Sequence, residues 1–178
     1  MRQIVAGTLI SLDGVIENAN EWMGPWFSPE LGQAVGSIMG AQDAMLLGRV
    51  TYDELAAYWP KQEGEMADTM NGTPKYVVSN TLEAADWQNT TLLRGDVLAE
   101  ITELKQRDGK NIGMTGSGIL TSWLLQQGLV DELHLFVFPV VLGSGKRFFS
   151  AATGKLPLKL AGSETYETGV VHLTYAQA

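Results

Sequence analysis

The stretch AMLLGRVTYDELAAYW, residues 44–59, decides how this sequence is expected to fold. Its start, Ala44 to Leu47, is continuously apolar, which is typical of a short strand covered on both faces. Gly48 follows, and we expect a helix from about Val50. The stretch therefore predicts a buried strand that turns directly into a helix.

The turn between this strand and this helix has chemistry that suits a phosphate. Gly48 has no side chain and lets another backbone or a ligand approach closely. Arg49 and Thr51 stand in the first helical turn, where free N–H groups and the helix dipole favour an anion. Arginine adds a planar fork of donors that matches a phosphate. Because the pattern is short and common, these residues alone favour an ordinary turn with a solvated Arg49.

Composition indicates a globular protein that forms one domain over residues 1–178. Hydrophobic residues make up 45% of the chain and charged residues 18%, and the net charge is −8. This acidic balance argues against nucleic acid and anionic membranes as partners. The chain has no cysteine and two histidines, each inside a strand-like run, so we expect no metal site. We also expect no signal peptide or transmembrane segment, which fits a cytoplasmic protein.

Strands and helices alternate through the first three-quarters of the chain, and the end is all strand. Strands are expected over residues 2–10, 75–78, 90–93, 111–114 and 132–138, with a final hairpin over 156–165 and 170–175. Further helices are expected over residues 29–39, 97–106 and 119–127. The pattern predicts an α/β fold: a central, mainly parallel sheet flanked by helices, with a C-terminal antiparallel hairpin.

Residues 11–27 are expected to form a long loop with three large aromatic side chains, Trp22, Trp26 and Phe27. Long loops in compact domains often act as lids over a site. The same rings would also serve to pin the loop to the core. The sequence favours neither interpretation.

Three expected strand ends carry groups that bind phosphates. They are Gly48 to Thr51, the pair Ser79 and Asn80, and the turn Gly116 to Gly118. Ligands of parallel sheets bind at the carboxyl ends of the strands, where these segments would meet. None of them is specific alone, and a complete G-x-G-x-x-G fingerprint is absent. Together they predict a nucleotide site.

The order of these motifs resembles that of the dihydrofolate-reductase-like superfamily. It is most similar to the reductase domain of bacterial riboflavin biosynthesis and its small stand-alone relatives. The resemblance covers nearly the whole chain and is carried by SLDG (11–14), LLGRVTYDEL (46–55), KYVVSN (75–80), MTGSGILTSWLL (114–125) and LVDELHLFVFPVVLGSGKRFF (129–149).

This resemblance implies an NADPH-dependent reductase that transfers a hydride to a small heteroaromatic or carbonyl substrate, such as a pterin or flavin precursor. It also implies a homodimer. The match of motifs implies that Gly48, Arg49 and Thr51 hold the phosphates, Ser79 and Asn80 lie near the adenosine ribose and its 2′-phosphate, Gly116, Ser117 and Gly118 line the nicotinamide and pyrophosphate, and Ala6 and Gly14 border the nicotinamide.

Glu30 is the candidate proton donor, because it stands where folate enzymes place their substrate-binding carboxylate. A glutamate is also simply favoured in the first turn of a helix. The chain departs from the folate enzymes at Phe136, where they carry a threonine, and at Ser117, which interrupts their Gly-Gly pair. Neither the arginine that clamps the folate tail nor the arginine-bearing helix that grips the ribityl phosphate is found, so the substrate stays open.

A second hypothesis assigns the chain to a different class of protein. It is a protein that binds NADPH or another nucleotide on the same fold without catalysing a reaction. A third, a structural dimer without a ligand, would leave the three strand-end motifs as coincidence. The apolar run 133–142 would contribute either to a dimer interface or to the central core.

Overall fold

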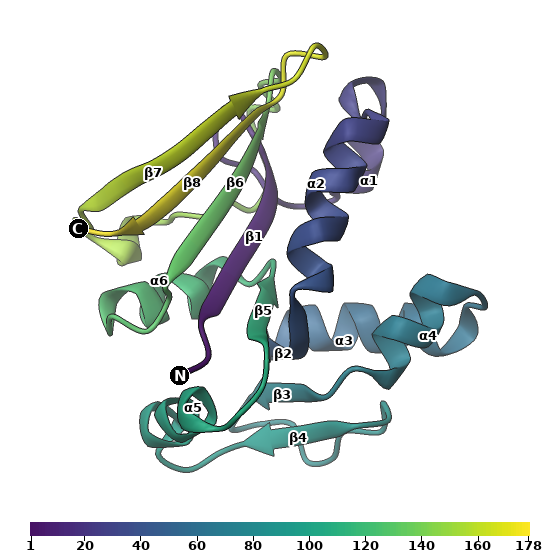
Figure 1. Cartoon of the computed structure of the whole chain (residues 1–178), viewed down its shortest axis with the longest axis vertical. Coiled ribbons are helices and arrows are strands. Elements are labelled where there is room, and N and C mark those ends of the chain that lie inside the picture. Colours follow the sequence, from purple (N-terminus) through teal and green to yellow (C-terminus); the bar gives the residue numbers. More distant parts are fainter.

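A computed structural model describes residues 1–178, apart from the side chain of Ala152. One eight-stranded sheet, in the order β4-β3-β2-β5-β1-β6-β8-β7, organises the chain (Figure 1). Its strands are β1 (Ile4–Ser11), β2 (Gln42–Gly48), β3 (Lys75–Val78), β4 (Thr90–Leu93), β5 (Asn111–Thr115), β6 (Glu132–Phe138), β7 (Leu158–Thr165) and β8 (Val171–Gln177).

The sheet is mainly parallel, as the sequence predicted. Strands β1 to β6 pair in parallel, whereas β8 pairs antiparallel with β6 and with β7. This confirms the C-terminal hairpin. Because β6 lies between β1 and β8, most of the apolar run 133–142 belongs to the core rather than to a free edge.

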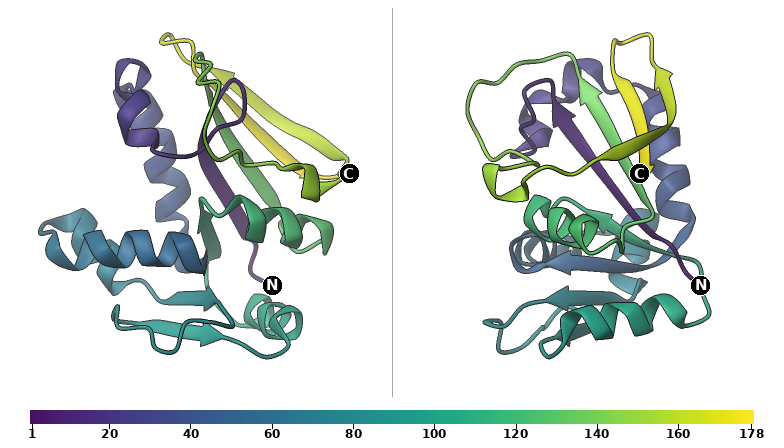
Figure 2. Two further views of the ribbon diagram at one scale, coloured as in Figure 1. Left: turned by 180° about the vertical axis from the view of Figure 1, so that it is seen from behind. Right: turned by 90° about the vertical axis from the view of Figure 1, so that its left-hand side faces the viewer.

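Helices cover both faces of the sheet (Figures 1 and 2). Helices α2, α3 and α4 pack on one face, and α5 and α6 pack on the other with the largest apolar cluster. The helices are α1 (Ala19–Trp22), η1 (Gly24–Trp26), α2 (Pro29–Gly40), α3 (Arg49–Tyr58), η2 (Trp59–Lys61), α4 (Glu65–Gly72), α5 (Val97–Gln106), α6 (Gly118–Gln126) and η3 (Ala151–Thr153). Among the described residues, none of them is long and apolar enough to cross a membrane.

Side-chain caps fix the starts of two helices where the sequence predicted them. The Ser28 hydroxyl accepts a hydrogen bond from the Leu31 N–H at 3.2 Å, and Pro29 occupies the first turn. The Asp96 carboxylate accepts one from the Ala99 N–H at 3.1 Å. Each cap satisfies a backbone donor that the first turn leaves free.

The segment 11–27 is not the continuous loop that the sequence predicted, because it contains α1 and η1. Asn18 adopts a left-handed conformation before α1, with φ of 51°. The Trp22 ring meets the Phe138 ring edge-to-face at 5.5 Å, and Trp26 packs in the same cluster. These two rings therefore pin the segment to the core, whereas Phe27 is 42% exposed.

Lys75 is a buried cation inside β3, with no exposed surface. Its ammonium donates to the carbonyls of Asn71, Thr73 and Gln88 at 3.1, 2.7 and 3.2 Å and lies 4.2 Å from the centre of the Trp87 ring. Desolvation lowers the pKa of Lys75 to about 8. The lysine thus ties the end of α4 and the segments around Thr73 and Gln88 to β3.

The titration of Lys75 predicts a pH-dependent stability. Between pH 8 and 10.5 the folded protein has released the Lys75 proton, while the unfolded chain still holds it. The free energy of unfolding should therefore rise with pH across this window, by at most about 1.4 kcal/mol per pH unit. Lys75→Met should be less stable at pH 7 by about 1–3 kcal/mol, because three carbonyls lose their donor. Urea unfolding of both proteins from pH 7 to 10.5 measures this, and parallel profiles would contradict it.

Candidate functional site

Two cavities lie at the carboxyl ends of the inner strands, and the three phosphate-friendly segments predicted from sequence lead to the same region. Strands β3, β2 and β5 are neighbours in the sheet, so their ends lie side by side. Ser117 lines the first cavity, and the preceding residue, Gly116, lines the second. Consecutive residues of the turn after β5 therefore line the two cavities, one each.

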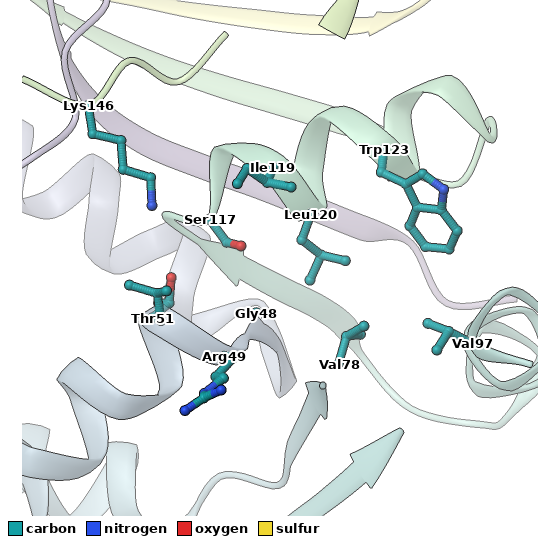
Figure 3. A pocket seen from close by; sticks show the side chains of 11 residues that line it. Gly48, Arg49, Thr51, Val78, Val97, Ser117, Ile119, Leu120, Trp123 and Lys146 are labelled. Atoms are coloured by element: carbon teal, nitrogen blue, oxygen red, sulfur yellow. The ribbon is translucent and has the colours of Figure 1, made fainter. Parts of the chain in front are cut away.

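The first cavity, which we call the groove, has a volume of about 390 Å³. It runs from the start of α3 to the side of α6 and α5 (Figure 3). It is lined by Gly48, Arg49, Val50, Thr51, Val78, Val97, Ser117, Ile119, Leu120, Trp123 and Lys146.

One end of the groove is cationic. The Arg49 guanidinium donates to the Thr81 hydroxyl at 2.6 Å and lies 3.5 Å from the Asp53 carboxylate, with half of its side chain exposed. The Lys146 side chain extends from the loop after β6 toward Thr51 and Ser117 (Figure 3). The start of α3 adds free N–H groups and the positive end of its dipole. This end of the groove is suited to an anion.

The other end of the groove is apolar. Val78, Val97, Leu120 and Trp123 form its wall, and they come from β3, α5 and α6. A flat, uncharged ring would lose water on both faces there. A molecule that joins a phosphate to a ring therefore fits the whole groove.

Two glycines allow the close packing around the groove. A Cβ atom on Gly48 would lie 2.4 Å from the Ser117 hydroxyl oxygen. A Cβ atom on Gly118 would lie 2.4 Å from the Phe148 carbonyl oxygen. Gly116 and Ser117 both adopt left-handed conformations, with φ of 62° and 51°, and so turn the chain from β5 into α6. The absence of a side chain at Gly48 lets the end of β2 approach the start of α6, and the absence of one at Gly118 lets the start of α6 approach Phe148.

Asp13, in the SLDG motif, holds the loop that carries Lys146. Its carboxylate accepts hydrogen bonds from the Ser11 hydroxyl at 2.7 Å and from the N–H groups of Leu142 and Gly143 at 3.1 and 2.8 Å. These hydrogen bonds lower the pKa of Asp13 to about 2, the Ser11 hydroxyl having the largest effect. Asp13 is therefore ionised at neutral pH and fixes the loop above the groove.

The structure brings Gly48, Arg49, Thr51 and Ser117 together in the groove, but it leaves other predicted residues outside. The Ser79 hydroxyl accepts hydrogen bonds from the N–H groups of Thr81 and Leu82, so it stabilises its own turn. Asn80 is exposed. Neither residue lines the groove, whose contact with this strand end is Val78.

Ala6, Gly14 and Gly118 also line neither cavity. Ala6 is buried in β1, where it pairs with Met114 and Leu133. The Gly14 carbonyl accepts a hydrogen bond from the Phe148 N–H at 2.9 Å. These glycines and this alanine shape the backbone around the site rather than its walls.

Glu30 lies exposed in the first turn of α2, and it lines neither cavity. Burial raises the pKa of Tyr166 to about 12, with further contributions from its hydrogen bond to Glu164 and from the charges of Glu164 and Glu30. The structure therefore does not bring Glu30 together with the residues of the groove.

Lys146 and Trp123 line the groove but were not predicted as site residues. Lys146 follows Gly143-Ser144-Gly145 in the sequence, and a lysine after a glycine-rich turn was the available signal. Trp123 lies inside an apolar helix, where its pattern is that of a core residue. Only the spatial arrangement of α6 and α5 shows that it lines the groove.

The second cavity, which we call the cleft, has a volume of about 420 Å³ and lies between the sheet and helices α1 to α4. Its described lining contains no Asp, Glu, Lys, Arg, His or Tyr. The lining residues are Gly7, Thr8, Leu9, Ile16, Ala19, Val35, Ile38, Met39, Gln42, Met45, Leu55, Trp59, Met66, Met70, Gly113, Met114, Thr115, Gly116 and Phe136.

The fold and the two adjoining cavities define a protein of the dihydrofolate-reductase-like class. More closely, the chain belongs to the family described as RibD C-terminal domain, whose model matches residues 2–172. The uncharacterized protein YyaP of Bacillus subtilis (strain 168) is 32% identical over 182 residues, which cover 98% of this chain and 94% of that protein.

Solved structures share the fold at low sequence identity. A Shewanella sp. PV-4 protein assigned to riboflavin biosynthesis superposes with a TM-score of 0.80 at 22% identity, covering 99% of both chains. The diaminohydroxyphosphoribosylaminopyrimidine deaminase/5-amino-6-(5-phosphoribosylamino)uracil reductase of Thermotoga maritima gives 0.69 at 15%, covering 99% of this chain and 57% of that one. Dihydrofolate reductase from Enterococcus faecalis, complexed with NADP(H), gives 0.66 at 14%, covering 98% and 95%. This likeness shows the fold, which is that of reductases.

The contact between Gly48 and Ser117 predicts a specific pair of stability effects. Gly48→Ala should destabilise the protein by about 1–3 kcal/mol, because the new methyl group collides with the Ser117 hydroxyl. Adding Ser117→Ala should recover most of that loss, since the next contact, to the Ser117 Cβ atom, lies at 3.4 Å. Thermal unfolding of the two single variants and the double variant measures the coupling. Additive losses would show that the two side chains do not meet.

Proposed function

We propose that the protein is an NADPH-dependent reductase that transfers a hydride to a small molecule bound in the cleft. The observation that carries the proposal is the turn at Gly116 and Ser117, whose two residues line one cavity each: a groove with a cationic end and an apolar end, and an apolar cleft. A dinucleotide needs the first cavity, and a hydride acceptor needs the second. Membership of the RibD C-terminal domain family and the reductase fold support it.

The residues of the groove fit NADPH. Arg49 and Lys146 would hold phosphates, and the Thr51 and Ser117 hydroxyls lie between them. The apolar wall around Val97 and Trp123 would take the adenine. Bound NADPH supplies a hydride, and the protein's task is to position it against the acceptor.

A reductase needs a source for the proton that accompanies the hydride, whereas a protein that only binds the nucleotide does not. No acidic, basic or tyrosine side chain lines the described part of the cleft, so we assign the proton to water. The role of Glu30 as donor stays a prediction from the sequence, and Glu30→Gln in the same turnover assay tests it. Oxidation of NADPH by any acceptor would exclude the silent alternative.

Arg49→Ala should weaken NADPH binding at least about tenfold and change NADH binding by less than about threefold. A guanidinium bond to a phosphate contributes on the order of 1.5–3 kcal/mol, and NADH lacks the 2′-phosphate. Tryptophan fluorescence and calorimetry measure both dissociation constants.

Arg107→Ala is the matched control. Arg107 forms an exposed ion pair with Glu103 one helical turn away, as Arg49 does with Asp53, but it lies outside the groove. If Arg49→Ala weakened NADPH and NADH binding equally, Arg49 would not bind the 2′-phosphate of NADPH. Failure of the wild-type protein to bind either nucleotide would refute the reductase proposal as a whole.

A further inference from the structure

We infer that the cleft takes an uncharged, flat molecule with a carbonyl oxygen, and not a phosphorylated or carboxylated one. This inference rests on the proposed function only in naming that molecule as the hydride acceptor. The site and its selectivity follow from the lining of the cleft alone.

The cleft carries no charge that could hold an anionic group. Its described lining has no ionisable side chain. The helices around it, α1 to α4, carry six acidic residues and a single basic one, Arg49, which lines the groove. Lys61, on η2, is exposed and outside the lining. Arg49 and Lys146 belong to the groove, on the other side of the Gly116–Ser117 step. An anion in the cleft would lose its hydration without a partner.

Five methionines give the cleft an adaptable apolar wall. Met45, Met70 and Met114 are at most 7% exposed, whereas Met66, on α4, is 50% exposed. The fifth methionine, Met39, is partly buried, and the buried Phe136 also lines the cleft. Methionine side chains adjust to ligands of different outline and make favourable contacts with aromatic rings. The wall therefore suits flat aromatic molecules of more than one shape.

Two side chains of the cleft lining, Trp59 and Gln42, carry N–H donors that can recognise an acceptor atom. The Trp59 indole Nε1 is buried and has no hydrogen-bond partner among the described residues. A buried donor without a partner costs about 1–3 kcal/mol, so a small rotation of the indole that brings Nε1 to a ligand oxygen would be favoured. The Gln42 amide lies over Gly113, where a Cβ atom would come within 1.8 Å of its oxygen. Gly113 thus keeps room for a side-chain amide at the wall.

Reduction of such a ligand needs no acidic side chain of the protein as proton donor. The carbonyl carbon takes the hydride from NADPH and the carbonyl oxygen takes a proton from water, giving an alcohol, NADP⁺ and hydroxide. Negative charge develops on the carbonyl oxygen during the reduction, and Trp59 and Gln42 can donate hydrogen bonds to that oxygen.

The test compares three matched naphthalenes by calorimetry, without cofactor: 2-acetylnaphthalene, 6-acetyl-2-naphthoate and 2-ethylnaphthalene. The wild-type protein should bind the ketone at least about tenfold more tightly than the carboxylate. Trp59→Phe should weaken binding of the ketone about five- to tenfold and change binding of 2-ethylnaphthalene by less than about twofold, because only the ketone accepts a hydrogen bond.

Met66 provides a gain-of-function arm that does not depend on Trp59. Because half of its side chain is exposed, Met66→Arg should fold and bring a cation to the wall. It should reduce the preference for the ketone over the carboxylate to about threefold or less, whereas the neutral control Met66→Gln should keep it. Equal wild-type binding of ketone and carboxylate, or no binding of the ketone, would overturn the inference.

An NADPH titration of the same samples separates the two proposals. Ketone binding without NADPH binding would refute the reductase function and keep the selectivity of the cleft. NADPH binding with equal or stronger binding of the carboxylate would keep the reductase function and refute the selectivity.

Discussion

The approach of the β2 end to the α6 start is the constraint on which both cavities depend. The separation is set by Gly48, since any side chain there would collide with the Ser117 hydroxyl. It places the start of α3 beside the start of α6, so two helix N-termini border one groove. The same approach forces the chain through the left-handed turn at Gly116 and Ser117, which separates the groove from the cleft. The contact between Gly48 and Ser117 and the turn that follows from it thus shape both the groove and the cleft.

The cationic end of the groove is assembled from distant parts of the sequence. Arg49 comes with α3, whereas Lys146 comes with the loop after β6, which is tied down from the SLDG segment by the ionised Asp13. Arg147 repeats this link by donating to the Asp13 carbonyl at 3.0 Å. The N-terminal motif therefore acts on the groove through the loop it holds, and its own glycine contributes backbone geometry rather than a contact.

Much of the fold could be predicted from the sequence because its signals are local. The apolar run at Ala44, the caps Ser28 and Asp96, and the turn at Gly169 each specify an element without reference to the rest of the chain. The helical segment around Trp22 was missed, because a four-residue helix is stabilised by the ring contact with Phe138 and not by its own pattern. Within the site, a local pattern was enough to predict Arg49, which lines the groove, whereas the sequence did not show that the Ser79 hydroxyl accepts a hydrogen bond within its own turn.

The two cavities divide the electrostatics of the chain. Two cations, Arg49 and Lys146, line the groove, whereas the described lining of the cleft has no charged side chain. In a reductase the cofactor carries the phosphates, so the charges needed to bind it are best kept away from the hydride acceptor, where they would bind the wrong ligand. A shared fold with enzymes that act on phosphorylated pyrimidines therefore does not carry their substrate to this chain. The wall formed by α2, α3 and α4 can change while the contact between Gly48 and Ser117 stays the same, so the lining of the cleft can vary on a constant fold.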